Sequence, residues 1–164
     1  MDMLMSGRSG PRVPGLARIA AAAVGLCLAA SHAQAADDVT TYTTETAFED
    51  VAADLSDAII NRGYVIDYHG MVGEMLKRTA ADVGASKPLY KGAELFQFCS
   101  AVVSRNAMEK DIANIAYCPY GLFVYEAEAK PGTVTVGFRR LPPGDGRDEV
   151  NALLDEIARE AAGE

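Results

Sequence analysis

The clearest strand pattern in the chain lies at residues 120–139, YGLFVYEAEAKPGTVTVGFR. Residues 120–127 are rich in aromatic and β-branched side chains, and residues 133–139 alternate Val and Phe with Thr and Gly. Alternation with a period of two is typical of a strand that buries one face. The sequence KPG at 130–132 separates the two runs and favours a turn. We therefore predict a β-hairpin here.

Helices and further strands flank this hairpin. A helix that begins near Phe48 carries apolar side chains at 3.6-residue spacing, and Gly63 ends it. Thr46 and Glu49 form a capping box at its start. A last helix, residues 150–161, has the same one-sided pattern. The remaining predicted elements are a strand at 39–44, a strand at 64–68, a helix at 71–79 that stops at Gly84, a strand at 94–99, and a short helix capped by Ser100 or Ser104.

The order of these elements indicates the fold class. It is β-α-β-α-β-α-β-β-α, and the longer helices are apolar on one side only. Such helices bury that side against a sheet. We expect an α+β fold, a two-layer sandwich in which helices cover one face of a single, mostly antiparallel sheet. At about 100–200 residues per domain, a chain of 164 residues has room for one such domain.

The first 35 residues have the pattern of a secretory signal peptide. A cationic lead ends at Arg18, an apolar core occupies residues 19–30, and Ala33-Gln34-Ala35 supplies the small side chains that a signal peptidase accepts. The core is shorter than the ~20 residues that span a bilayer, so cleavage after Ala35 is favoured over a retained membrane anchor. We expect a mature domain of residues 36–164 in the periplasm of a Gram-negative bacterium.

The charge of the chain argues against two classes of partner. The net charge is −8, and residues 1–35 hold three arginines against Asp2. Residues 36–164 therefore keep 12 of the 15 basic and 22 of the 23 acidic groups, a net charge of −10. So acidic a surface repels phosphate backbones and anionic lipid headgroups. We expect no nucleic-acid partner and no stable membrane anchor after cleavage.

Several motifs of the mature chain, taken together, resemble one family. They are FQFCSA at 96–101 with Ser104 and Met108 after it, Asn114, CPY at 118–120, and VYE at 124–126. Their order and spacing resemble the domain-of-unknown-function 302 (DUF302) family over about residues 42–140. The resemblance implies a two-layer domain related in topology to the TATA-binding-protein fold, and pairing as a homodimer. The family has no settled activity, so the resemblance implies no chemistry.

Cys99 and Cys118 are the two cysteines that remain once Cys27 leaves with the signal peptide. Three interpretations are open: two separate buried thiols, a disulfide, or a redox or metal site. Separate thiols are favoured. If the two residues lie on parallel neighbouring strands, they sit at opposite ends of the sheet. A disulfide needs Cα atoms within ~7 Å. If the strands do not run parallel, this objection disappears.

His69 is the single histidine of the mature chain. It lies at a predicted strand-to-helix junction, and with Met75 or Met108 it would offer the nitrogen and sulfur ligands that haem or copper uses. A surface histidine that hydrogen-bonds near the helix start is favoured. Tyr120 has Tyr117 and Tyr125 as sequence neighbours, which predicts either a ligand pocket or dimer face, or a sheet core with hydroxyls that reach solvent.

We therefore expect a non-enzymatic periplasmic module, dimeric, that binds a small ligand or a protein partner without a cofactor. The candidate ligand-binding residues are Cys99, Cys118, His69 and Tyr120. The alternative is a periplasmic redox protein, or a metal- or haem-binding protein, that uses Cys99, Cys118 and His69. An enzyme is less favoured, because the sequence has no Ser/His/Asp order, phosphate loop or zinc-ligand spacing.

Overall fold

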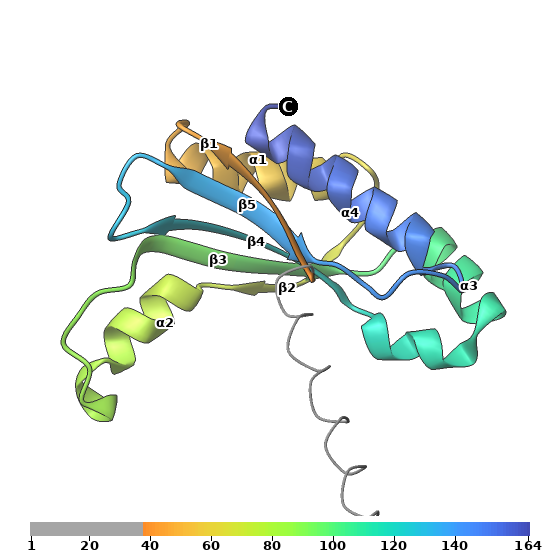
Figure 1. The fold of residues 1–164 in the computed structure, drawn as a ribbon, viewed down its shortest axis with the longest axis horizontal. Coiled ribbons are helices and arrows are strands. Elements are labelled where there is room, and N and C mark those ends of the chain that lie inside the picture. Colours follow the sequence, from red (N-terminus) through yellow and green to blue (C-terminus); the bar gives the residue numbers. More distant parts are fainter. Residues whose placement is uncertain (1–37) are drawn as a thin grey trace, which may run out of the picture. The chain divides into compact units, whose positions relative to one another are not determined.

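The computed structural model describes residues 38–164 (Figure 1). The predicted signal peptide, its cleavage site after Ala35, and residues Cys27 and His32 lie outside this range. No helix between residues 38 and 164 is long and apolar enough to cross a bilayer.

Five strands form one antiparallel sheet. They are β1 (Val39–Thr44), β2 (Ile66–Gly70), β3 (Tyr90–Phe98), β4 (Tyr120–Ala127) and β5 (Val134–Arg139). Their order in the sheet is β1-β5-β4-β3-β2. The predicted hairpin is confirmed as β4 and β5, with Val124 opposite Val136. It lies in the interior of the sheet, because β1 pairs with β5 and β3 pairs with β4.

Two helices form a layer on one face of this sheet. α1 (Phe48–Ile60) and α4 (Arg147–Ala162) pack against each other, and both contact the strands (Figure 1). This layer confirms the predicted two-layer α+β sandwich and the predicted order of elements. α3 (Ala101–Lys110) packs against α4 and against the short helix η2 (Ile112–Tyr117).

α2 (Val72–Thr79) lies apart from the layer of α1 and α4. It contacts β3 and the short helix η1 (Ala81–Val83), near the β2 edge of the sheet (Figure 1). β2 pairs only with residues 95–98, so the first half of β3 has no strand partner on that side. Gly73 lies against β3 there, since a Cβ atom on it would stand 2.9 Å from the backbone nitrogen of Ala93. The predicted cover of helices on one face therefore consists of α1 and α4, with α2 at the edge.

The core lies between the sheet and the layer of α1 and α4. Its side chains come from the predicted apolar faces of these two helices and from one face of the sheet. The largest are Val51, Leu55 and Ile59 of α1, Phe96, Phe98, Leu122, Val124, Val136 and Phe138 of the sheet, and Leu154 and Ile157 of α4. Burial of one such side chain stabilises the fold by roughly 1.5–3 kcal/mol, so this cluster is the main source of stability.

The opposite face of the sheet carries two uncharged rows of side chains. Directly opposed residues on neighbouring strands point to the same side of a sheet. One row holds Thr41, Gly137, Phe123 and Leu95, and the next holds Thr43, Thr135, Tyr125 and Ala93. We call these two rows the outer face. The rings of Phe123 and Tyr125 stack on it with centroids 6.1 Å apart.

The ends of some elements differ from the prediction. Thr46 does not cap α1: Ala47 is the N-cap residue and makes no side-chain cap, while the hydroxyl of Thr46 bonds that of Thr44. β2 begins two residues later than predicted, at Ile66. β3 begins four residues earlier, at Tyr90, because β4 pairs with it along its whole length. Periodicity alone misses such tertiary pairing.

Candidate functional site

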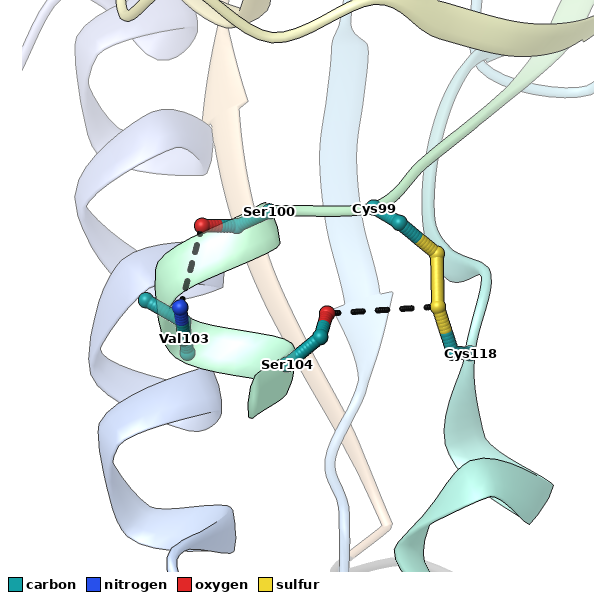
Figure 2. The surroundings of a disulfide bond; sticks show 5 residues. All are labelled: Cys99, Ser100, Val103, Ser104 and Cys118. Atoms are coloured by element: carbon teal, nitrogen blue, oxygen red, sulfur yellow. Dashed lines mark hydrogen bonds between the residues drawn. A yellow bond between two sulfur atoms is a disulfide. The ribbon is translucent and has the colours of Figure 1, made fainter. Parts of the chain in front are cut away.

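Cys99 and Cys118 form a disulfide bond (Figure 2). Cys99 directly follows β3, and Cys118 precedes β4 by two residues. Because these strands are antiparallel, Phe98 lies opposite Tyr120, and the two cysteines meet at the same end of the sheet with Cα atoms 6.2 Å apart. The favoured prediction of separate thiols was therefore wrong. It assumed parallel strands, for which the distance would have been too large.

The disulfide has a mainly structural setting. Its cysteines are 19 residues apart, and a closed loop of this length stabilises a fold by roughly 3 kcal/mol in the chain-entropy model. Ser100 caps α3 as predicted, since its hydroxyl accepts from the Val103 amide at 3.2 Å (Figure 2). The hydroxyl of Ser104 lies 3.9 Å from the Cys118 sulfur. The bond holds the start of α3 against the start of β4, and it leaves no thiolate for a metal.

Tyr120 lies beside the disulfide but inside the core. Its ring packs edge-on against Phe98 with centroids 6.2 Å apart, and the residue is buried. The pKa of Tyr120 is raised, mainly because the residue is buried. The hydrogen bond with Ser104 lowers the pKa and the charge of Glu149 raises it, but burial has the largest effect. A ligand at the surface does not reach this side chain. The three tyrosines also do not cluster, because Tyr125 lies on the outer face and Tyr117 lies under Arg147.

His69 is the last residue but one of β2, and α2 begins three residues later at Val72, which confirms its predicted place at a strand-to-helix junction. Its ring stacks on Phe96 with centroids 4.2 Å apart, and Nε2 is 2.6 Å from a carboxylate oxygen of Glu94. Met75 is on α2 and Met108 is on α3, and among the described residues neither sulfur hydrogen-bonds to His69. Within residues 38–164, no three His, Cys, Asp or Glu side chains meet in a metal-binding group. The structure thus does not bring His69 together with Cys99 and Cys118.

A cleft of about 440 Å³ lies between α2, the segment after it and the start of β3. This volume falls in the range of roughly 300–1,000 Å³ that small-molecule sites have. Its lining includes the apolar side chains of Leu76, Val83, Leu89 and Tyr90, and the charged side chains of Glu74, Lys77, Lys87, Lys91 and Glu128. The cleft holds none of the four residues that the sequence suggested as ligand-binding.

α2 contributes one wall of this cleft, and it is the α-helix of residues 38–164 without a buried residue. Its sequence nevertheless has an apolar face that includes Met71, Met75 and Leu76. Met71 and Met75 are exposed, and Leu76 lines the cleft. The sequence signal for this site was an amphipathic helix that carries Lys77 and is followed by Lys87 and Lys91. Helical spacing alone does not distinguish a face that lines a cleft from one that is buried in the core, so this signal does not identify the site.

A solved structure has the same architecture. It is described as the crystal structure of an uncharacterized conserved protein DUF302 from Bacillus stearothermophilus, and it superposes with a TM-score of 0.62. The superposition covers 76% of this chain and 98% of that chain, at 13% sequence identity. The chain has a DUF302-like fold. The sequence itself matches no protein-family model and none of the curated proteins. The predicted resemblance is therefore confirmed at the level of the fold.

Three polar side chains, Asn151, Arg147 and the motif residue Asn114, anchor the loop before α4 in this DUF302-like fold. Asn151 is buried on α4, and its amide group donates to the carbonyl of Leu141 and accepts from the amide of Leu141 at 2.9 and 2.8 Å. Arg147 donates to Asn114 at 2.9 Å and to the carbonyl of Pro142 at 2.7 Å. All these groups are satisfied within the fold, so their role is structural.

A second polar cluster joins β1 to α4. The Tyr42 hydroxyl donates to Asp155, and Arg159 donates to the same carboxylate at 2.9 Å while its guanidinium lies over the Tyr42 ring. Burial opposes ionisation of Asp155, but the hydrogen bonds from Tyr42 and Arg159 outweigh it, so the pKa of the carboxyl is lowered. Burial and the bond to Asp155 raise the pKa of Tyr42. The cluster fixes the edge strand to the helical layer.

Proposed function

We propose that the protein is an exported, non-enzymatic module that binds a small ligand in the cleft between α2 and β3. The observation that carries this proposal is the unburied apolar face of α2. Leu76 of that face lines the cleft together with Val83 and Leu89, which are 75% and 57% exposed. Exposed apolar area costs about 25 cal/mol per Å², so a ligand that covers these side chains gains that free energy. The binding needs no cofactor.

The chemistry of the described residues supports binding rather than catalysis. Within residues 38–164, the single histidine is engaged by Glu94 and both cysteines are bonded to each other. The common nucleophile–base pairs need a free cysteine or a hydroxyl beside a histidine. In residues 38–164, neither a free cysteine nor a hydroxyl group hydrogen-bonds to His69.

Export to the periplasm is part of the same proposal. The disulfide between Cys99 and Cys118 supports it, since such bonds persist in oxidising compartments and are rare in the cytosol. The signal-peptide pattern of residues 1–35 supports it independently. The intact mass of the exported protein, with and without reductant and alkylating agent, tests both points. A mass that retains residues 1–35 contradicts the proposed cleavage, and thiols that alkylate without reductant contradict the bond.

The binding experiment uses a neutral apolar dye, Nile red, whose fluorescence rises in an apolar site. Val83→Asp places a charge in the cleft, and Val102→Asp is its matched control, because Val102 is 69% exposed on α3 and does not line the cleft. We expect saturable fluorescence with the unaltered protein and with Val102→Asp, and a loss of at least fivefold in affinity with Val83→Asp. Equal binding by both variants would contradict the proposed site.

We also propose that two copies pair through the outer face. Its rows of Phe123, Tyr125 and their neighbours are uncharged, whereas the chain has a net charge of −8. Two acidic copies repel least where an uncharged, aromatic face meets its equivalent. Sedimentation velocity is expected to show a dimer, and Phe123→Glu to shift it to monomer while Val102→Asp does not. A dimer that survives Phe123→Glu contradicts the outer face as the interface.

A further inference from the structure

We infer that the ligand of the cleft is a free anionic amphipath, a carboxylate carried on an aliphatic chain. This inference rests on the proposed binding function and specifies its ligand. The chain has five lysines, and three of them, Lys77, Lys87 and Lys91, line this one cleft. They come from α2, from the loop after η1 and from β3. Cationic side chains gather here on a protein whose net charge is negative.

These lysines are poorly neutralised by the protein itself. No carboxylate of residues 38–164 lies within 4.0 Å of the Lys77 or Lys87 ammonium groups. Lys91 faces Glu126 at 3.6 Å, a long contact for an ion pair. Glu74 and Glu128 also line the cleft, and both are exposed. With Glu126 counted, the three lysines stand against three carboxylates, so the positive charge is local to Lys77 and Lys87, whose ammonium groups have no carboxylate of the described residues within 4.0 Å.

The apolar and cationic parts of the cleft are adjacent along the chain. Lys77 follows Leu76 directly, and Lys87 stands two residues before Leu89. A ligand that contacts both the apolar side chains and the lysines must carry an apolar chain and a negatively charged group. Each methylene group that leaves water raises affinity about fourfold, so the chain supplies most of the affinity. The carboxylate, held by two exposed lysines, adds up to about fivefold for each ion pair and provides the selectivity.

Calorimetric titration of the exported protein with octanoate and its neutral analogue octanamide tests the inference. We expect octanoate to bind on the order of tenfold more tightly than octanamide. In the double variant Lys77→Gln, Lys87→Gln, the preference should fall below about threefold. Lys110→Gln is the matched control, because Lys110 is an exposed lysine on α3 outside the cleft, and it should keep the preference.

The outcomes separate this inference from the proposed function. If octanamide binds as tightly as octanoate and Val83→Asp weakens both, the cleft is a ligand site but the anionic class is wrong. If neither compound binds but Nile red still binds in a way that Val83→Asp weakens, the inference is wrong and the proposed function stands; if Nile red does not bind either, both are wrong. If acetate competes as well as octanoate, the aliphatic part of the inference fails. Vesicles of phosphatidylglycerol distinguish a free ligand from membrane lipid: we expect no binding to them, and binding that the lysine variants abolish would overturn the free-ligand assignment.

Discussion

The α4 side and the α2 side of the molecule treat the same kind of helix differently. Both helices have an apolar face in the sequence, yet α4 buries seven residues and α2 buries none. α4 lies over β1 and β5 and packs against α1, whereas α2 packs against η1 and against β3, whose first half β2 leaves unpaired on that side. An apolar face thus shows which side of a helix is favourable to bury, and the topology of the sheet determines whether another part of the protein packs against that side. Next to α2, the topology leaves a cleft.

The sharpest test of this difference makes one substitution in two helices. Leu55→Ala in α1 removes a fully buried side chain and should cost about 2–5 kcal/mol in the free energy of unfolding. Leu76→Ala in α2 should cost less than about 1 kcal/mol, because the residue is only partly covered. Urea denaturation of both variants gives the comparison, with the polar-face change Asp54→Ala as a control within about 0.5 kcal/mol. Equal losses in the free energy of unfolding for the two leucine variants would contradict the conclusion that α1 is buried and α2 is not.

The disulfide should stabilise the fold by roughly 3 kcal/mol. Cys99→Ser and Cys118→Ser each remove the same bond, so each should cost about this amount, and the double variant should cost little more than either one. A double-mutant cycle in denaturant, on oxidised protein, measures it. Losses that add would mean that the two cysteines act independently.

The sequence predicted the parts of the fold that local pattern controls. The alternation at 120–139 gave β4 and β5 because a half-buried hairpin repeats every two residues, and the faces of α1 and α4 followed from 3.6-residue spacing. The disulfide was not predictable in this way. Whether Cys99 and Cys118 meet depends on the antiparallel pairing of β3 with β4 across an intervening helix, which no local pattern encodes.

The candidate site was missed for a related reason. Periodicity predicts which side chains of α2 share a face, but it does not predict what lies opposite them, so it does not place Leu76 in a cleft. Asn151 shows the converse case. It lies on the buried face of α4, where a polar residue is unexpected, because Leu141 provides both a donor and an acceptor for its amide.

Removal of that amide gives a third prediction, on the well-packed side. Asn151→Ala leaves the backbone groups of Leu141 without partners and should cost about 1–3 kcal/mol in the free energy of unfolding. Asn106→Ala on α3, which loses only exposed contacts at 3.4 Å to Glu149, should cost about 0.5 kcal/mol or less. Thermal unfolding of the two variants measures the contrast, and similar midpoints would show that the anchor at Leu141 contributes nothing.

The smallest expected effect is a pH dependence from Asp155. Its pKa is lower in the folded state than in the unfolded chain, so its ionised form stabilises the fold above the unfolded pKa of about 3.9. That contribution is lost as the pH falls through the lower, folded pKa. Asp155→Asn should flatten this part of the stability profile, measured by denaturant melts between about pH 2 and 5. A profile that is unchanged by the substitution would mean that Tyr42 and Arg159 do not favour the ionised carboxylate.

Hydrogen exchange of the α2 and α4 amides, with and without octanoate, measures whether α2 is uncovered until a ligand fills the cleft. Amides of an uncovered helix exchange through frequent local opening, and those of a buried helix exchange near the global rate. We expect fast exchange in α2 that slows when octanoate fills the cleft. We expect slow exchange in α4 that octanoate changes much less. Equally slow exchange in both helices, or an α2 that octanoate does not protect, would contradict these expectations.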